Sequence, residues 1–309
     1  MRPTLRQLEY FVAVAEHRAF GPAADALAVT QPSLSKQIAA LEAELGLVLF
    51  ERSSRKVRLT EAGAALLEDA GAALSAARAF KAHARRLAGD SLRRLRAGVL
   101  PSIGAYFMPR LRERLNTSMP DMRISLVEGA SRDLLARLGS GELDFVVASL
   151  SDADGYVHRA LFDETLWICS APDDPLMDED GPVKPEALQG RYLLTLGPEF
   201  HITRIVERLA AQAGARLSED YRGVSLDAVR QMAVSGAGVA VLPSLYALGE
   251  AIRDPAFKVR RIDAPEAVHP VRLYWRKSAA ETALFERLAD EMIAEKLKIR
   301  SERAPRFRV

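Results

Sequence analysis

The chain has 309 residues, of which 49% are hydrophobic, and its formal net charge is only +2. This length has room for a small domain and a larger one of two parts, and the small net charge excludes a bulk basic tract as the device for binding nucleic acid. The single cysteine excludes a disulfide within the chain and favours a reducing, cytoplasmic setting. We expect no signal region, no membrane-spanning run and no membrane partner.

Three helices are predicted at the start of the chain. A helix over 4–17 has one apolar face, made by Leu5, Leu8, Phe11, Val12 and Ala15. Pro22 suits the first turn of a second helix. A third helix follows the candidate N-cap Thr30, has Pro32 in its first turn and ends at Gly46. Its buried stripe is predicted to contain Leu34, Ile38, Leu41 and Leu45.

The other face of the third helix carries side chains that can bind DNA. Donors and acceptors for base edges and phosphates gather near its N-terminus, at Gln31, Ser33, Ser35, Lys36 and Gln37. Segment 49–60 predicts a hairpin or wing, and residues 51–58 carry four basic side chains and one acidic one, a balance of +3. These features favour a helix–turn–helix that puts one helix into the major groove of double-stranded DNA. The alternative is a three-helix packing unit with a solvated basic loop.

A long alanine-rich helix is predicted over 60–87. It carries a heptad seam of mostly small side chains, which are Leu66, Ala70, Ala73, Ala77, Phe80, Ala84 and Leu87. Small side chains bury little area, so such a seam associates weakly by itself. The seam can dimerise two chains, or the helix can pack on its own domain. Residues 89–91 are predicted to break the helix.

Strand and helix segments alternate through the rest of the chain, which predicts an α/β fold with helices covering mostly parallel sheets. Strands are expected over 95–100, 123–127, 145–148, 165–170, 191–195, 239–242 and 269–275. Helices are expected over 106–115, 131–138, 201–213, 226–234 and 279–298. Ligands of such folds bind at the carboxyl ends of strands, near helix N-termini. Segment 172–182 is expected to be an acidic surface loop, and 301–309 a basic tail.

Residues 4–63 resemble the winged helix–turn–helix of LysR-type transcriptional regulators. The likeness rests on Gln31-Pro-Ser-Leu-Ser-Lys-Gln-Ile, Leu49-Phe-Glu-Arg and Leu59-Thr-Glu-Ala-Gly, and it runs without a gap. It implies that Gln31, Pro32, Ser33, Ser35, Lys36 and Gln37 face the major groove, and that Arg52 and Arg55 lie near the wing. It also implies a dimerising linker that places two DNA-binding domains on two half-sites.

The chain beyond residue 91 resembles, more loosely, the regulatory domain of the same family, a pair of subdomains like a periplasmic binding protein. The likeness rests on Pro101-Ser-Ile-Gly, Gly141-Glu-Leu-Asp, Leu161-Phe-Asp-Glu and Val234-Ser-Gly-Ala-Gly-Val-Ala-Val-Leu-Pro. It implies a DNA-binding domain over 1–60, a linker over 61–90 and a regulatory domain over 91–300. Subdomain I would hold 92–164 plus 268–300, and subdomain II would hold 165–267.

The same resemblance places an effector in the cleft between the two subdomains. The residues it assigns to that cleft are Pro101, Ser102, Ser131, His201, Thr203 and Gly238. Ser102 and Thr203 also carry hydroxyls at predicted helix N-termini, where an anion is favoured. Each of these two residues fits an ordinary N-cap equally well.

Within the family, the chain most resembles the hydrogen-peroxide-sensing OxyR branch, as in Ser225-Leu-Asp-Ala-Val-Arg-Gln-Met. By the resemblance, members of that branch form a disulfide in the region matching 200–213, where this chain has His201 and Ala210 instead. The only cysteine, Cys169, falls in an apolar strand and is expected to be buried and inert. His201 can bind an anion, sense pH or simply be a polar side chain at a helix end.

Catalytic motifs are weak or missing. Gly236-Ala-Gly lacks the third glycine of a dinucleotide loop and leads into a strand rather than following one. The five histidines are scattered, so we expect no metal, no cofactor and no enzyme activity. Two alternatives stay open. One is an oxidant-responsive regulator that uses Cys169 or methionines such as Met108 and Met232; the other is a solute-binding protein with a helical extension.

The sequence therefore predicts a DNA-binding transcriptional regulator that acts as a homo-oligomer, a dimer of dimers by the resemblance. A small-molecule effector of unknown identity is expected to change the closure of the subdomains and thereby the spacing of the DNA-binding domains. This requires that the effector bind the two conformations with different affinity. RNA polymerase is a further expected partner.

Overall fold

The computed structural model of the protein describes residues 3–52, 57–87, 93–150, 155–279 and 281–304; for residues 52, 79, 82, 83 and 85–87 it describes the backbone only. The chain divides into two units. The first holds Met1–Arg93, Ala136–Asp144 and Ser278–Ala280, and the second holds Arg94–Leu135, Phe145–Lys277 and Glu281–Val309.

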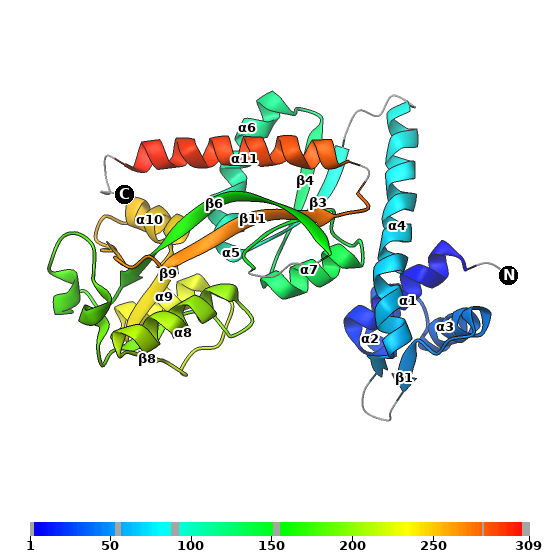
Figure 1. Ribbon diagram of the computed structural model, residues 1–309, viewed down its shortest axis with the longest axis horizontal. Helices are drawn as coiled ribbons and strands as arrows, with labels where there is room; N and C mark the ends of the chain where they lie inside the picture. Colours follow the sequence, from blue (N-terminus) through cyan, green and yellow to red (C-terminus); the bar gives the residue numbers. More distant parts are fainter. Residues whose placement is uncertain (1–2, 53–56, 88–92, 151–154, 280, 305–309) are drawn as a thin grey trace. The chain divides into compact units, whose positions relative to one another are not determined.

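The first unit opens with three helices and a hairpin (Figure 1). These are α1 (Leu5–His17), α2 (Phe20–Ala26), α3 (Gln31–Leu45), β1 (Phe50–Arg52) and β2 (Val57–Leu59). Thr4 and Gln7 form a capping box at the start of α1. Gly46, with φ of 66°, ends α3 as predicted. Thr30 occupies the N-cap position of α3, but its side chain makes no capping hydrogen bond.

The core of this unit joins the three helices to the hairpin. Leu34, Ile38 and Leu41 of α3 are fully buried, whereas Leu45 is 37% exposed. The buried stripe therefore ends at Leu41, and Leu45, the last residue predicted for it, is not part of it. Phe50 of the hairpin receives the ring edges of Phe11 and Phe20, with centroid distances of 5.5 and 6.0 Å. Apolar contacts of this kind fix the hairpin beside α1 and α2.

Helix α4 (Glu61–Leu87) packs at its beginning on its own domain, and its role in joining two chains stays a prediction. Ala70 and Leu74 are buried in the core of the first unit, so the beginning of the helix packs on its own domain. Of the other residues of the predicted seam, Ala73 and Ala84 are exposed, Phe80 is 77% exposed and Ala77 is half-buried. Phe80 and Ala84 are therefore open to a partner, and the side chain of Leu87 lies outside the described residues.

The second unit is built on one mixed sheet in the order β4-β3-β5-β11-β6-β9-β7-β8, with β10 also paired to β6. Two long antiparallel strands, β6 (Tyr156–Cys169) and β11 (Val268–Arg276), run along its middle (Figure 1). Beyond residue 165, β6 leaves β11 and pairs with β9 and β10. The pairs β3–β5 and β7–β9 are parallel, so each half of the sheet has parallel strands and the long strands connect the halves.

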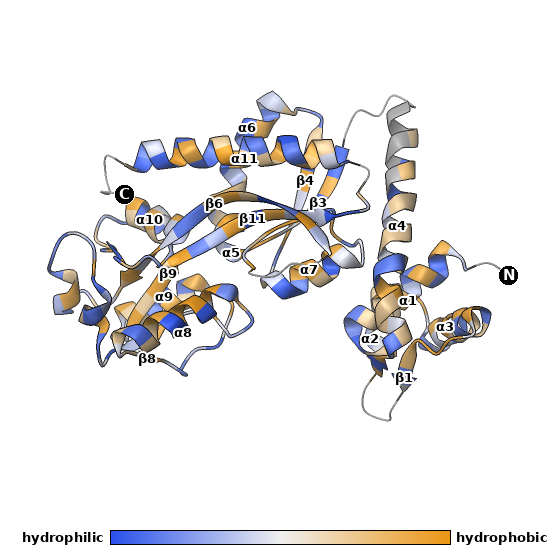
Figure 2. Cartoon of the chain, viewed as in Figure 1, coloured by the Kyte–Doolittle hydropathy of each residue, from blue (hydrophilic) through white to orange (hydrophobic). Residues whose placement is uncertain are grey.

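The other strands of the sheet are short. They are β3 (Arg93–Val99), β4 (Met122–Glu128), β5 (Phe145–Ala148), β7 (Tyr192–Leu194), β8 (Arg216–Leu217), β9 (Val239–Pro243) and β10 (Arg260–Arg261). The helices are α5 (Pro101–Tyr106), α6 (Met108–Ser118), α7 (Ser131–Gly139), α8 (His201–Ala213), α9 (Leu226–Val234), α10 (Ser244–Arg253) and α11 (Thr282–Arg303). Short 3-10 helices cover Pro175–Met177 and Pro185–Leu188. The apolar strand β9 is orange in Figure 2 and is fully buried.

Several elements of the second unit differ from the prediction, among them the short strands β8 and β10, which were not expected. The helix expected over 106–115 is α6, and the unpredicted helix α5 precedes it, with Pro101 at its start, where proline fits well. Strand β6 begins nine residues earlier than expected. The sequence did not indicate its first part, because that part is half-exposed and lacks an apolar run. Helix α10 was missed because it follows β9 directly, with Pro243 and no side-chain cap at its start.

Candidate DNA-binding surface and ligand cleft

The predicted recognition side chains lie on the open face of α3. Gln31, Pro32, Ser33, Lys36 and Gln37 are exposed, and Ser35 is half-buried. None of the polar ones hydrogen-bonds or ion-pairs through its side chain with another described residue, so their donors and acceptors are available to a ligand. The apolar face beneath them holds the helix in place, so this polar face can meet base edges without reorganisation of the fold.

The predicted wing is a two-stranded hairpin. Strand β1 pairs antiparallel with β2, with Phe50 opposite Leu59 and Glu51 opposite Arg58. Arg52 lies in β1, but its side chain is outside the described residues, and Arg55 lies wholly outside them. The hairpin itself is thus as expected, and its basic tip stays a prediction.

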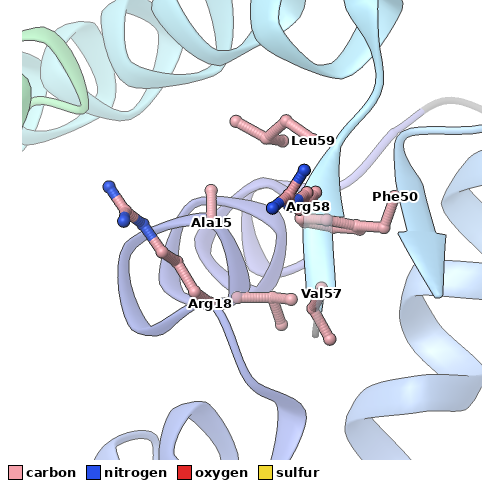
Figure 3. Close-up of a pocket in the computed structure, with 7 residues that line it drawn as sticks. Ala15, Arg18, Phe50, Val57, Arg58 and Leu59 are labelled. Carbon is pink, nitrogen blue, oxygen red and sulfur yellow. The ribbon is translucent and has the colours of Figure 1, made fainter. Parts of the chain in front are cut away.

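A groove of about 400 Å³ lies between the end of α1 and the hairpin (Figure 3). Its walls are apolar apart from two arginines: Val14, Ala15, Arg18, Phe50, Val57, Arg58 and Leu59. Figure 3 shows Arg18 and Arg58 on either side of Ala15. Neither guanidinium has an ion pair or hydrogen bond with a described residue. Arg18 was missed because a lone arginine at a helix end gives no sequence signal, and Arg58 was counted only as wing charge.

In the second unit, a small cavity lies where the two halves of the sheet meet. Leu100, Pro101 and Ser102 come from the first half, and Leu196, Phe200, His201, Ile202, Leu226 and Pro243 come from the second, with His269 of β11 between them. Its volume is about 20 Å³, which is room for about one water molecule. The ring of His269 stacks on that of His201, with centroids 6.3 Å apart.

Three of the six predicted cleft residues line this cavity, namely Pro101, Ser102 and His201. The hydroxyl of Thr203 instead donates to the carbonyl oxygens of Leu196 and Gly197, at 2.9 and 2.8 Å. It therefore fixes the loop before α8, and it does not present its proton to a ligand.

Ser131 and Gly238 also lie elsewhere than in the cavity wall. The Ser131 hydroxyl accepts a hydrogen bond from the Ser149 amide at 3.4 Å, at the start of α7. Gly238 has φ of 154°, and a Cβ there would come within 2.6 Å of the Tyr192 carbonyl oxygen, so the backbone requires glycine. Both residues have a structural explanation.

The anion expected beside Ser102 belongs to the protein itself. The Ser102 hydroxyl donates to the carboxylate of Glu164 at 3.5 Å, and Glu164 is completely buried. In the sequence, Glu164 stands out only as part of a family motif. Burial, rather than spacing, makes this residue unusual, and burial could not be inferred from the alternation of this half-exposed strand.

The electrostatics of the cavity favour a neutral His201. Burial, followed by the positive charges of His269, Arg208, Arg204 and Arg272, lowers the pKa of His201 to about 4. A neutral imidazole can donate and accept hydrogen bonds but attracts no anion by charge. This pKa disfavours the interpretation of His201 as a physiological pH sensor, which stays untested.

Cys169 is buried in the second half of the sheet, as expected. Its thiol is fully shielded, and burial raises its pKa to about 12. Because the thiolate is the reactive form, burial disfavours reaction at this cysteine, and the oxidant-responsive alternative built on it stays an untested prediction. Met108 is likewise buried, and Met232 packs against the core.

The residues that the structure describes contain no group of three or more histidine, cysteine, aspartate or glutamate side chains able to hold a metal ion. Among the same residues, no helix has the length and hydrophobicity needed to cross a bilayer.

A helix–turn–helix whose third helix exposes a polar face, joined to an α/β domain of two sheet halves, defines a DNA-binding regulator of transcription. Residues 5–64 match the bacterial regulatory helix-turn-helix proteins of the lysR family, and residues 88–296 match the LysR substrate binding domain. The chain belongs to the LysR family.

Relatives and solved structures agree with this assignment. The chain is 35% identical over 294 residues to a hydrogen peroxide-inducible genes activator of Dickeya chrysanthemi, covering 93% of this chain and 94% of that protein. A full-length OxyR variant from Pseudomonas aeruginosa is similar in structure, with a TM-score of 0.69, 30% identity and coverage of 94% and 95%. CbnR complexed with its target DNA has a TM-score of 0.55, 27% identity and coverage of 94% and 99%.

The family assignment settles two sequence alternatives. The alternative of a solute-binding protein with a helical extension is wrong, because residues 5–64 match a family of DNA-binding regulators. The expectation of a regulator rather than an enzyme is confirmed, since the family and its relatives regulate transcription. The single cysteine of the chain agrees with the missing cysteine pair noted in the sequence.

Proposed function

We propose that a small molecule entering the cavity at His201 sets the activity of this regulator. The observation that carries this proposal is the cavity itself, which has walls from both halves of the sheet and room for about one water. A larger ligand that reaches between those walls must move them apart. Its binding is therefore tied to the separation of the halves, which is the differential affinity that regulation requires.

We propose that double-stranded DNA meets the polar face of α3 and the wing. Gln31, Pro32, Ser33, Ser35, Lys36 and Gln37 would contact the major groove, and Arg52 and Arg55 the flanking backbone or minor groove. To these we add Arg18 and Arg58, whose guanidinium groups lack partners among the described residues. Both would neutralise phosphates.

We propose that the active form is a homo-oligomer, arranged as a dimer of dimers. Strand β4 is an edge of the sheet, with backbone groups free to pair. Beside it lies a groove of about 440 Å³ with a mixed lining: the apolar Met108, Pro109, Leu115, Met122, Ile124 and Leu126, and the polar Arg112, Glu113, Asn116 and Arg123. A second copy of the chain would cover this groove, and the exposed Phe80 of α4 would provide another contact. A Leu126→Glu chain of lower mass by light scattering would support the first contact; an unchanged mass would remove it.

The names of the relatives make hydrogen peroxide the first effector to test. A cysteine-based response is disfavoured, because the only thiol is buried and its pKa is raised. We therefore propose a ligand that binds reversibly. We also propose a cytoplasmic location, contact with RNA polymerase, and the predicted domain limits of 1–60, 61–90 and 91–300.

Selection of bound fragments from genomic DNA, followed by a salt titration of the selected duplex, tests the DNA part. Specific binding should weaken steeply as salt rises, because neutralised phosphates release counterions. A chain that ignores duplex DNA at low ionic strength would end the regulator assignment for this protein.

Thermal unfolding of the full chain with hydrogen peroxide and a metabolite library tests the ligand part. A compound that binds only the folded state raises the midpoint with its concentration. The shift should disappear when a bulky side chain fills the cavity, as in Leu226→Trp. If the shift persists in that variant, the ligand binds elsewhere.

A further inference from the structure

Glu164 is a completely buried carboxylate at the junction between the two halves of the sheet. It lies on β6 opposite His269 of β11, one residue before the last pair these strands share. Immediately beyond, β6 pairs with β9 and β10 of the second half. A shift of one half relative to the other must therefore pass through its surroundings.

The carboxylate binds three elements at once. It accepts a hydrogen bond from the Leu245 amide at 3.0 Å and from the Ser102 hydroxyl at 3.5 Å, and it lies 3.3 Å from Nδ1 of His269. Leu245 stands in the first turn of α10, where an amide has no acceptor within its own helix. The side chain of Glu164 thus substitutes for the missing helical acceptor.

The charge of Glu164 is maintained by its neighbours. Burial alone would raise its pKa, but the hydrogen bond and charge of His269, the charge of Lys296 and the Leu245 amide bring the pKa below its usual value. Burial in turn lowers the pKa of Lys296, against the attraction of Glu164. The ammonium of Lys296 also lies over the ring of Phe162, 4.7 Å from its centroid.

Two of the three hydrogen-bonding partners of Glu164 are also walls of the cavity. Ser102 and His269 both line it, and His269 stacks on His201 at the beginning of α8. The third partner, Leu245, belongs to α10, which packs against α5 and β6. One carboxylate therefore joins the cavity walls to the first turn of α10, the helix that begins just after the wall residue Pro243.

We infer that Glu164 is a positioning residue that couples occupation of the cavity to the start of α10. The inference rests on the proposed function, in which a ligand moves the cavity walls. Displacing Ser102 or His269 withdraws a hydrogen bond from the carboxylate, which then rearranges and loosens its hold on the Leu245 amide. The first turn of α10, and with it the packing between α10 and α5, thus responds to the cavity through this side chain, beside the direct connection at the wall residue Pro243.

Hydrogen exchange of the Leu245 amide tests this coupling without any ligand. In the full chain, Glu164→Gln should speed exchange at Leu245 by about tenfold. Glu295→Gln is the matched control, since Glu295 is also a buried glutamate but binds Arg110 of α6. The control should leave exchange at Leu245 unchanged. Equal exchange in Glu164→Gln and the native chain would overturn the inference.

A double-mutant cycle separates coupling from a merely structural role. His269→Asn should speed exchange at Leu245 in the native background and add nothing in the Glu164→Gln background. Additive effects would mean that His269 does not act through Glu164. If Glu164→Gln fails to fold, Glu164→Asp keeps the charge while shortening the reach to Leu245, and the same cycle applies.

Failure of the inference differs from failure of the proposed function. If no compound stabilises the chain, the proposed ligand site fails while the cycle result stands. If hydrogen peroxide or a library compound stabilises the native and Glu164→Gln chains equally, and speeds exchange at Leu245 equally in both, the coupling role fails while the ligand site stands.

Discussion

The two binding regions of this molecule differ in how their polar groups are used. On α3, the polar side chains predicted to read DNA, from Gln31 to Gln37, are exposed or half-buried and have no partner among the described residues. Around the cavity of the second unit, the polar groups are already engaged, as with Thr203 on two carbonyl oxygens and Ser102 on Glu164. The candidate DNA-binding surface is thus open to a ligand, whereas the proposed ligand cavity would have to exchange internal hydrogen bonds for ligand bonds.

This difference suggests two kinds of recognition. A surface with free donors and acceptors on a rigid helix binds without reorganisation, as specific base contacts require. A cavity whose walls hydrogen-bond one another changes conformation when it is filled, as a regulatory site requires. Substitutions in each region test this difference.

The largest effect is expected from the core that supports α3. Ile38→Ala should destabilise the first unit by about 2–5 kcal/mol, because it empties a fully buried site. Denaturant unfolding followed by DNA binding would measure it. Ala40→Ser, on the exposed side of the same helix, should change stability by less than about 0.5 kcal/mol. Similar losses in the two variants would mean that α3 is not anchored by this stripe.

A smaller effect is expected at the polar face itself. Gln37→Ala should weaken binding to the selected duplex by about 1–3 kcal/mol if the amide reads a base edge, and leave stability unchanged. Competition between the selected and a random duplex measures this. An equal loss on both would show that Gln37 contacts the phosphate backbone rather than a base.

The parts of the fold that local sequence dictates were predicted well. Helix α3, its end at Gly46 and the apolar stripe of Leu34, Ile38 and Leu41 follow from periodicity and capping within fifteen residues. Helix α10 and the first half of β6 were missed, because long-range pairing with β11 and packing against β6 decide them. Local propensity has no access to those contacts.

The candidate sites divide in the same way. The polar residues of α3 were named correctly as an exposed face, since one helix carries them all. In the cavity wall, Pro101, Ser102 and His201 were expected, but His269 and its buried partner Glu164 behind the wall were not, because these two come from strands about a hundred residues apart in sequence. Their proximity follows from strand register, which a single sequence does not specify.

Thr203 tests the claim that the cavity region is internally satisfied. Thr203→Val keeps the shape of the side chain but removes the hydrogen that two carbonyl oxygens accept. We expect a loss of about 1 kcal/mol in stability. Thr117→Val, an exposed position on α6, should be nearly neutral. If stability is unchanged and the ligand-induced thermal shift is altered, Thr203 contacts the ligand after all.

The pH dependence of stability tests the environment of His201. Its folded pKa of about 4 is below the usual value of 6.5, so the unfolded chain takes up a proton first as the pH falls. The His201 contribution is therefore fully present above pH 6.5 and is lost progressively down to about pH 4. In His201→Gln this component should vanish from the thermal midpoints, and in the exposed His158→Gln it should persist. A native-like profile in His201→Gln would place the titration elsewhere.

The smallest change in specificity is expected from the groove beside the wing. If Arg18 and Arg58 neutralise phosphates, each substitution by alanine should lower the slope of log K against log salt by about one, equally on selected and random duplexes. Arg216→Ala, an exposed arginine on β8, supplies the control and should leave the slope unchanged. Because a phosphate contact carries no sequence information, affinity falls while discrimination stays constant. Unaltered slopes would mean that the free guanidinium groups serve another partner. A changed discrimination would mean that Arg58 reaches a base edge, which would join the groove to the recognition surface of α3.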